Sequence, residues 1–203
     1  MLKVSHKVFA LKSFIHLAAL SIVALLYYKA IVDLLGSDPV KEVIHFTGLG
    51  GLNLLLLTLL VSPVAKRFKL GWLLRVRRLL GLYAFFYACL HLLSYGAFEL
   101  QWDFSLLGSE IIERPYITVG MVVFSLLLML AVTSPDYFKR KLGKRWQKMH
   151  NAIYVIILLV PVHFYWSVKS DVSEPLVYFL LAFIALGLRW GKLRGWLKRR
   201  SIK

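Results

Sequence analysis

Acidic residues and cysteine are both scarce in this chain. It has 10 Asp and Glu against 26 Lys and Arg, and a single cysteine, Cys89. One cysteine excludes an internal disulfide, a thiolate metal cluster and a dithiol redox pair. Any redox chemistry must therefore come from a bound cofactor.

Apolar residues, by contrast, make up 59% of the 203 residues, whereas a soluble domain has roughly half. Stretches near 20 residues with few charges are typical of membrane-crossing helices. We expect an all-α membrane protein, a bundle of six transmembrane helices that forms a single domain over residues 1–203. We detect no internal repeat. The six predicted spans are 8–28, 45–64, 79–98, 115–134, 150–168 and 175–190.

The charges alternate between the connecting segments. Segments 1–7, 65–78, 135–149 and 189–203 hold 21 of the 26 basic residues, while 29–44, 99–114 and 169–174 hold nine of the ten acids. Because basic residues gather on the cytoplasmic side, both termini are predicted to be cytoplasmic. The net charge of +16 is thus explained by membrane orientation, and we expect no nucleic-acid partner.

Two histidines are predicted to lie at one depth. His91 is about 18 Å along the third span and His163 about 20 Å along the fifth, at 1.5 Å per residue. Both spans are expected to run outward from the cytoplasm. Two neutral imidazoles at one level can supply the axial ligands of a b-type haem. We therefore predict that His91 and His163 bind haem iron.

A second, inner site is also predicted, on weaker grounds. His150 marks the inner end of the fifth span, and Arg77 stands at the matching level of the third. On an uninterrupted helix, thirteen residues leave His150 and His163 about 140° apart, although Pro161 permits a kink. Haem number, one or two, stays open.

Two other classes of function compete with electron transfer. Intramembrane histidines also mark ion pathways, so a proton or metal transporter could use His16, His45, His91 and His163 as a relay. The predicted spans lack the buried Asp or Glu that usually accompany such relays. A pure assembly anchor for a periplasmic enzyme is the third alternative.

Four strings of the sequence carry a family resemblance. They closely resemble the MsrQ family, the haem-binding membrane subunits of the bacterial periplasmic methionine sulfoxide reductase system, within the wider ferric-reductase and NADPH-oxidase-like transmembrane class. The likeness runs from about residue 5 to 195. The strings are DPVKEVIHFTGLGGLNLLLLTLLVSPVAK, RVRRLLGLYAFFYACLHLLSYG, RPYITVG and KLGKRWQKMHNAIYVIILLVPVHFYWSVK.

The resemblance implies a non-catalytic electron-transfer subunit in the bacterial inner membrane. Electrons would come from the quinone pool or a cytoplasmic flavin reductase. They would go to a periplasmic molybdenum-cofactor subunit that reduces methionine sulfoxide in oxidised envelope proteins, a repair that belongs to oxidative stress. Members of the family are also associated with FMN, which would make the chain a flavoprotein.

Carried over by position, His91 and His163 match the family's outer haem pair and His150 matches its inner histidine. The wider class typically has two histidines on each of two helices, whereas here Arg77 stands where the inner partner would fall. The second haem would then be absent, five-coordinate or held by an unusual ligand.

Overall fold

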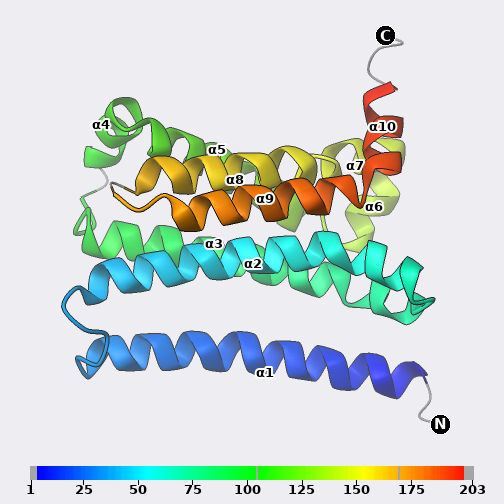
Figure 1. Cartoon of the computed structure of the whole chain (residues 1–203), viewed down its shortest axis with the longest axis horizontal. Coiled ribbons are helices and arrows are strands. Elements are labelled where there is room, and N and C mark those ends of the chain that lie inside the picture. The colour runs from blue at the N-terminus through cyan, green and yellow to red at the C-terminus, as the bar shows by residue number, and fades with distance from the viewer. Residues whose placement is uncertain (1–3, 104, 169, 199–203) are drawn as a thin grey trace. The chain divides into compact units, whose positions relative to one another are not determined.

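The computed structural model describes residues 4–103, 105–168 and 170–198. Within these ranges the regular structure is entirely helical (Figure 1). The chain forms two compact units, residues 1–108 and 109–203.

The first unit contains three long helices and one short 3-10 helix. The second long helix has a clear start signal, since Asp38 accepts a hydrogen bond of 2.9 Å from the backbone N–H of Lys41 and Pro39 occupies its first turn. A carboxylate at this position satisfies one of the backbone donors that a helix start leaves unpaired. The elements are α1 (Val4–Ile31), α2 (Pro39–Arg67), η1 (Gly71–Arg75) and α3 (Arg77–Phe98).

Helices α2 and α3 pack very closely because glycine lines one face of α2. A Cβ placed on Gly50 would lie 2.3 Å from the ring of Tyr87, a side chain that is only 3% exposed. In a membrane, helices gain nothing by removing apolar side chains from water, so their association depends on close van der Waals packing. Small residues permit that packing because they let the two backbones approach. The sequence GLGG in α2 therefore sets the spacing of this helix pair.

Helix α1 is bound to α3 through long polar side chains. Most of its large apolar side chains are exposed, such as Phe9 and Leu17, as expected for a lipid-facing helix. Buried polar groups in such a setting need partners. Three hydrogen bonds meet that need: Tyr83 Oη with His16 Nδ1 at 2.6 Å, Tyr87 Oη with the Ala19 carbonyl at 2.9 Å, and Tyr27 Oη with Ser94 Oγ at 2.8 Å.

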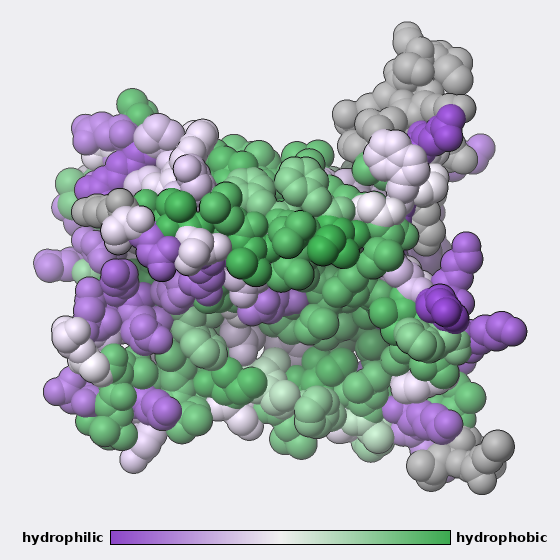
Figure 2. Space-filling model, viewed as in Figure 1, coloured by the Kyte–Doolittle hydropathy of each residue, from purple (hydrophilic) through white to green (hydrophobic). Residues whose placement is uncertain are grey.

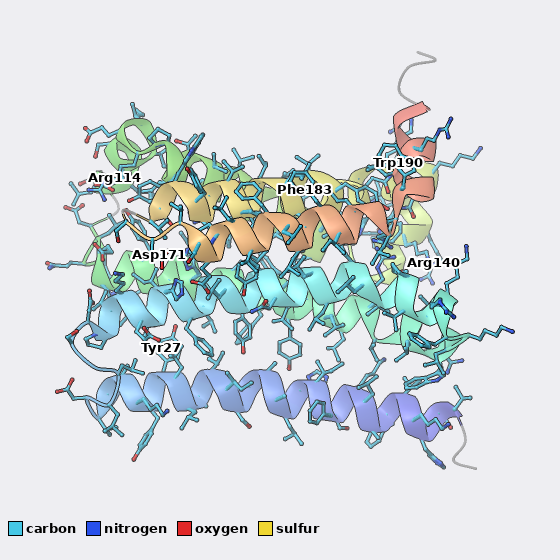
Figure 3. The ribbon with its side chains drawn as sticks, in the orientation of Figure 1. Tyr27, Arg114, Arg140, Asp171, Phe183 and Trp190 are labelled. Carbon is cyan, nitrogen blue, oxygen red and sulfur yellow. The ribbon has the colours of Figure 1, made fainter. Side chains whose placement is uncertain are left out.

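In the second unit, α8 packs against both α5 and α9. Helix α4 (Ser105–Glu113) carries the boundary between the units. Arg114 and Asp171 lie at one end of this unit and Arg140 and Trp190 at the other (Figure 3). The remaining helices are α5 (Pro115–Val132), α6 (Asp136–Leu142), α7 (Lys144–His150), α8 (Ile153–Ser167), α9 (Ser173–Gly187) and α10 (Trp190–Lys198).

In the described part of the chain, five helices are long and apolar enough to cross a membrane: α1, α2, α3, α5 and the α7–α8 stretch Lys144–Ser167. The sixth predicted span corresponds to α9, which is strongly apolar but has only 15 residues. Such a helix is about 22 Å long, against a hydrocarbon core of about 30 Å. Apolar surface covers α9 in Figure 2, with Leu180 and Phe183 about 60% exposed. The multi-pass membrane fold is thus confirmed, and the sixth span and the side of the termini stay predictions.

Candidate functional site

His91 lies half-buried in α3, against α2. Its Nδ1 is 2.9 Å from the backbone carbonyl oxygen of Ile44, 47 residues earlier. One turn farther along α2, Gly48 faces the ring, because a Cβ there would lie 3.1 Å from His91 Nδ1 and 3.2 Å from Cε1. Helix α2 therefore offers this imidazole an acceptor and a gap beside it.

His163 has the same surroundings in the second unit. It is half-buried in α8, and its Nδ1 is 2.7 Å from the carbonyl oxygen of Tyr116 in α5, also 47 residues earlier. One turn farther along α5, a Cβ on Gly120 would lie 2.8 Å from His163 Cε1 and 2.9 Å from Nδ1. The Tyr116 ring is 6.2 Å from the imidazole, centroid to centroid.

These hydrogen bonds decide the chemical form of both rings. A carbonyl oxygen can only accept, so Nδ1 carries the proton in His91 and in His163. A neutral imidazole protonated on Nδ1 has its lone pair on Nε2, the form in which histidine binds metals. Histidine ligands in metal sites commonly donate their other N–H to a backbone carbonyl in this way, which also fixes the ring orientation. Each unit thus supplies one imidazole that is protonated on Nδ1.

The two arrangements are related by a fixed shift of 72 positions. Adding 72 to residues 44, 48 and 91 gives 116, 120 and 163. The same shift aligns SP at 62–63 with SP at 134–135, and KLG at 69–71 with KLG at 141–143. The expectation that the chain has no internal repeat is therefore wrong, because α2–α3 and α5–α8 are two copies of one helix pair.

His150 has a different environment from the other two candidate ligands. Its Nε2 is 3.0 Å from Thr133 Oγ1, whose hydroxyl proton is donated to the Met129 carbonyl at 2.6 Å. The hydroxyl oxygen must then accept from His150, which places the proton on Nε2. The indole of Trp146 also stacks on the imidazole at 3.9 Å. Iron could bind Nε2 only if the hydrogen bond to Thr133 were broken.

His150 also ends a helix instead of beginning one. It is the last residue of α7, and the turn Asn151–Ala152 separates it from α8. Hydrogen bonds between residues three apart, such as the Ala152 N–H to the Met149 carbonyl at 2.9 Å, tighten this turn. The angle of about 140° between His150 and His163, which assumes an uninterrupted helix, does not apply.

Arg77 is half-buried and is the first residue of α3. The 72-residue shift pairs His150 not with Arg77 but with Arg78, which is exposed. Arg77 is selected when only the depth of each residue along its helix is compared. The repeat identifies Arg78 as the equivalent of His150. Arg77 and His91 are fourteen positions apart on the single helix α3, which corresponds to about 21 Å along its axis.

Comparisons with known proteins decide the family. Residues 46–161 match the family model described as "Ferric reductase like transmembrane component". Curated relatives named "Protein-methionine-sulfoxide reductase heme-binding subunit MsrQ" include those of Pectobacterium atrosepticum and Klebsiella pneumoniae. They are 48% and 46% identical over 187 residues, 92% of this chain and 94% of theirs. The chain belongs to the MsrQ family. No solved structure matches it.

The remaining intramembrane histidines of this MsrQ family member have local surroundings of their own. His16 Nδ1 is 2.6 Å from Tyr83 Oη, and His45 is half-buried near the start of α2. Among the described residues, no group of three or more His, Cys, Asp or Glu is placed to hold a metal ion. The pairing of His16 with Tyr83 gives this histidine a structural partner within the first unit.

The hydrogen bonds of His91 and His163 predict their tautomers in the haem-free protein. With ¹⁵N-labelled histidine at a pH where imidazole is neutral, both rings should show a protonated Nδ1 and an unprotonated Nε2, because Nδ1 lies within hydrogen-bond distance of a backbone carbonyl, which can only accept. His150 should show the opposite tautomer. Signals are assigned with single His→Gln variants. Protonation of Nε2 in either His91 or His163 would contradict the geometry described above.

Proposed function

We propose that this MsrQ family member is a b-type haem electron-transfer subunit, with His91 and His163 as axial ligands of haem iron. The observation that carries the proposal is the repeated arrangement in which a carbonyl of the neighbouring helix holds the Nδ1 proton. It leaves the lone pair of both imidazoles on Nε2, the nitrogen that a haem ligand uses. The relatives named as haem-binding subunits support the same group.

When bound, a bis-imidazole haem supplies a reversible one-electron carrier that needs no bond to form or break. The chain's own contribution is to hold two rings in fixed directions and to exclude water. The carbonyls of Ile44 and Tyr116 hold the rings. The helices on either side of the His163 contact are apolar, since α5 and α8 have no charged residue between Pro115 and Val132 or between Ile153 and Ser167.

We propose that the whole chain acts as one ferric-reductase-like domain in the bacterial inner membrane, with both termini cytoplasmic and α9 as the sixth span. A helix this short can cross where the bilayer thins locally. Electrons enter from the quinone pool or from a cytoplasmic flavin reductase. They leave to a periplasmic molybdenum-cofactor methionine sulfoxide reductase. The name of the relatives supports a methionine sulfoxide reductase as partner.

The outer connection, residues 99–115, is the proposed docking region for that reductase. It includes α4, where Ile112 is 83% exposed. Beside it, Pro115, Tyr116 and Trp166 line an open cavity of about 370 Å³. The carbonyl of Tyr116 holds His163, so this surface lies directly next to a proposed ligand. A partner bound here would approach the iron-binding helix closely.

The alternative to a single haem is a pair of haems, the second bound by His150 with Arg77 nearby. FMN is a further candidate cofactor. Guanidinium suits a haem propionate or a flavin phosphate. The hydrogen bond from His150 to Thr133 favours the single-haem form, because it engages the nitrogen that iron would need.

The competing function is a histidine relay for protons or metal ions. A haem protein is red when purified, and its alpha band sharpens on reduction with dithionite. A folded but colourless preparation would instead favour transport.

Removal of either proposed ligand should abolish the low-spin haem spectrum. His91→Ala and His163→Ala each take away one axial imidazole, so the absorption of bis-histidine haem should be lost while the protein still folds. His6→Ala, on the exposed first turns of α1, is the matched control and should keep the spectrum. A wild-type spectrum in His163→Ala would refute the ligand assignment.

The inner site is tested by haem stoichiometry. His150→Ala and Arg77→Ala should leave one haem per chain by pyridine haemochrome, since Arg77 is fourteen positions from His91 along α3 and the turn Asn151–Ala152 separates His150 from the helix that carries His163. If wild type holds two haems and either variant holds one, the second site is established there. Loss of all haem in His150→Ala would show that the outer pair is not sufficient.

A pure anchoring role predicts a different result from electron transfer. In membranes that contain the periplasmic reductase, His91→Ala should keep the two proteins associated but should reduce methionine sulfoxide turnover to background. Turnover is measured with quinol as donor, and co-purification of the partner is the control for docking. Unchanged turnover would identify the chain as an anchor.

A further inference from the structure

Gly48 and Gly120 occupy equivalent places beside the two candidate ligands. Each lies four residues after the carbonyl that holds the imidazole, Ile44 in α2 and Tyr116 in α5. Residues four apart in a helix share one face, one turn above the other. The imidazole therefore spans one turn of its neighbour, with Nδ1 on the carbonyl and the Nδ1–Cε1 edge facing the glycine.

The space beside each imidazole is too small for a methyl group. At Gly120 an added Cβ would lie 2.8 Å from Cε1, 2.9 Å from Nδ1 and 3.6 Å from Nε2 of His163. At Gly48 the corresponding distances to His91 are 3.1 Å from Nδ1 and 3.2 Å from Cε1. Distances below 3.0 Å essentially never occur for Cβ atoms, so the His163 ring would have to move, and the His91 ring would have to give way slightly.

We infer that Gly48 and Gly120 are positioning residues for the haem ligands, because the missing Cβ lets each ring keep its carbonyl bond while Nε2 keeps its direction. The inference rests on the proposed function, in which His91 and His163 bind iron. Displacing the ring would lengthen the bond from Nδ1 to the carbonyl and would tilt the Nε2 lone pair.

Both changes act on properties that a purely structural residue would not control. A hydrogen bond from Nδ1 raises the basicity of Nε2, and partners of this kind typically change metal affinity 10- to 100-fold. A less basic imidazole stabilises ferric iron less, so the midpoint potential should become more positive. The effect should be larger at Gly120, where the Cβ distance is shorter.

The chain offers two matched controls in the first unit. Gly81 lies within α3, and its added Cβ would meet Thr58 at an ordinary 3.7 Å. Gly50 lies two residues after Gly48 in the same interface, but its Cβ would strike Tyr87 at 2.3 Å and not His91. Gly50→Ala thus disturbs the packing of α2 on α3 without crowding the proposed ligand, while Gly81→Ala should disturb neither.

The experiment uses the full chain purified with haem, with Gly48→Ala, Gly120→Ala, Gly50→Ala and Gly81→Ala beside wild type. Three readouts are taken: haem retention, midpoint potential, and the low-spin ferric EPR signal, which reports the directions of the two imidazole planes. Gly120→Ala should retain haem 10- to 100-fold less tightly, shift the potential positively and change the EPR signal. Gly48→Ala should do the same to a smaller extent, and Gly81→Ala should match wild type.

Failure of this inference can be separated from failure of the proposed function. If wild type binds haem and the Gly48 and Gly120 variants match it, positioning is refuted and the haem function stands. The same conclusion follows if Gly50→Ala gives the same changes as Gly48→Ala, or if Gly48→Ala and Gly120→Ala both fail to fold. In either case close packing of the helices would explain why Gly48 and Gly120 are glycine. If wild type and Gly81→Ala bind no haem, the proposed function fails and the inference fails with it.

Discussion

An imidazole between apolar helices must place its N–H on an acceptor, and this constraint organises both halves of the molecule. Within a membrane the available acceptors are mainly backbone carbonyls. A side chain reaches such a carbonyl only if it lies close to the backbone of the neighbouring helix. His91 and His163 each use one carbonyl of the neighbouring helix. Because the ring must come so near the backbone, the neighbouring helix carries glycine one turn away.

The repeat shows that this arrangement was used twice. A carbonyl contact, a glycine and a histidine recur at one spacing although the apolar residues around them largely differ, so the geometry of the ring is the feature that the two copies share. The two copies differ at their other end, where Arg78 in one corresponds to His150 in the other. The histidine of each helix pair is thus matched, whereas His150 has no histidine counterpart in the first copy.

Polar side chains elsewhere follow the same rule with other partners. His16 pairs with Tyr83, and His150 is held by Thr133 and Trp146. Each of these two histidines forms its hydrogen bond with a hydroxyl group that comes from a distant part of the sequence, Tyr83 for His16 and Thr133 for His150. Residue type and depth therefore do not set His91 and His163 apart from the other two histidines. The partner does, because Nδ1 of His91 and of His163 lies on a backbone carbonyl, whereas His16 and His150 are paired with side-chain hydroxyls.

The sequence by itself determined the membrane class, five of the spans and the choice of His91 and His163 as the leading candidates, because hydropathy, charge and helical rise depend on local composition. The sequence did not reveal the repeat, because the two copies have different apolar residues at most positions and only a few identical residues stand among them. Only the tertiary structure decided which nitrogen of His91, His163 and His150 is protonated, that His150 ends a helix, and that Gly48 and Gly120 face the rings. Those properties depend on which backbone atoms of another helix come within hydrogen-bond distance, and no local pattern records that.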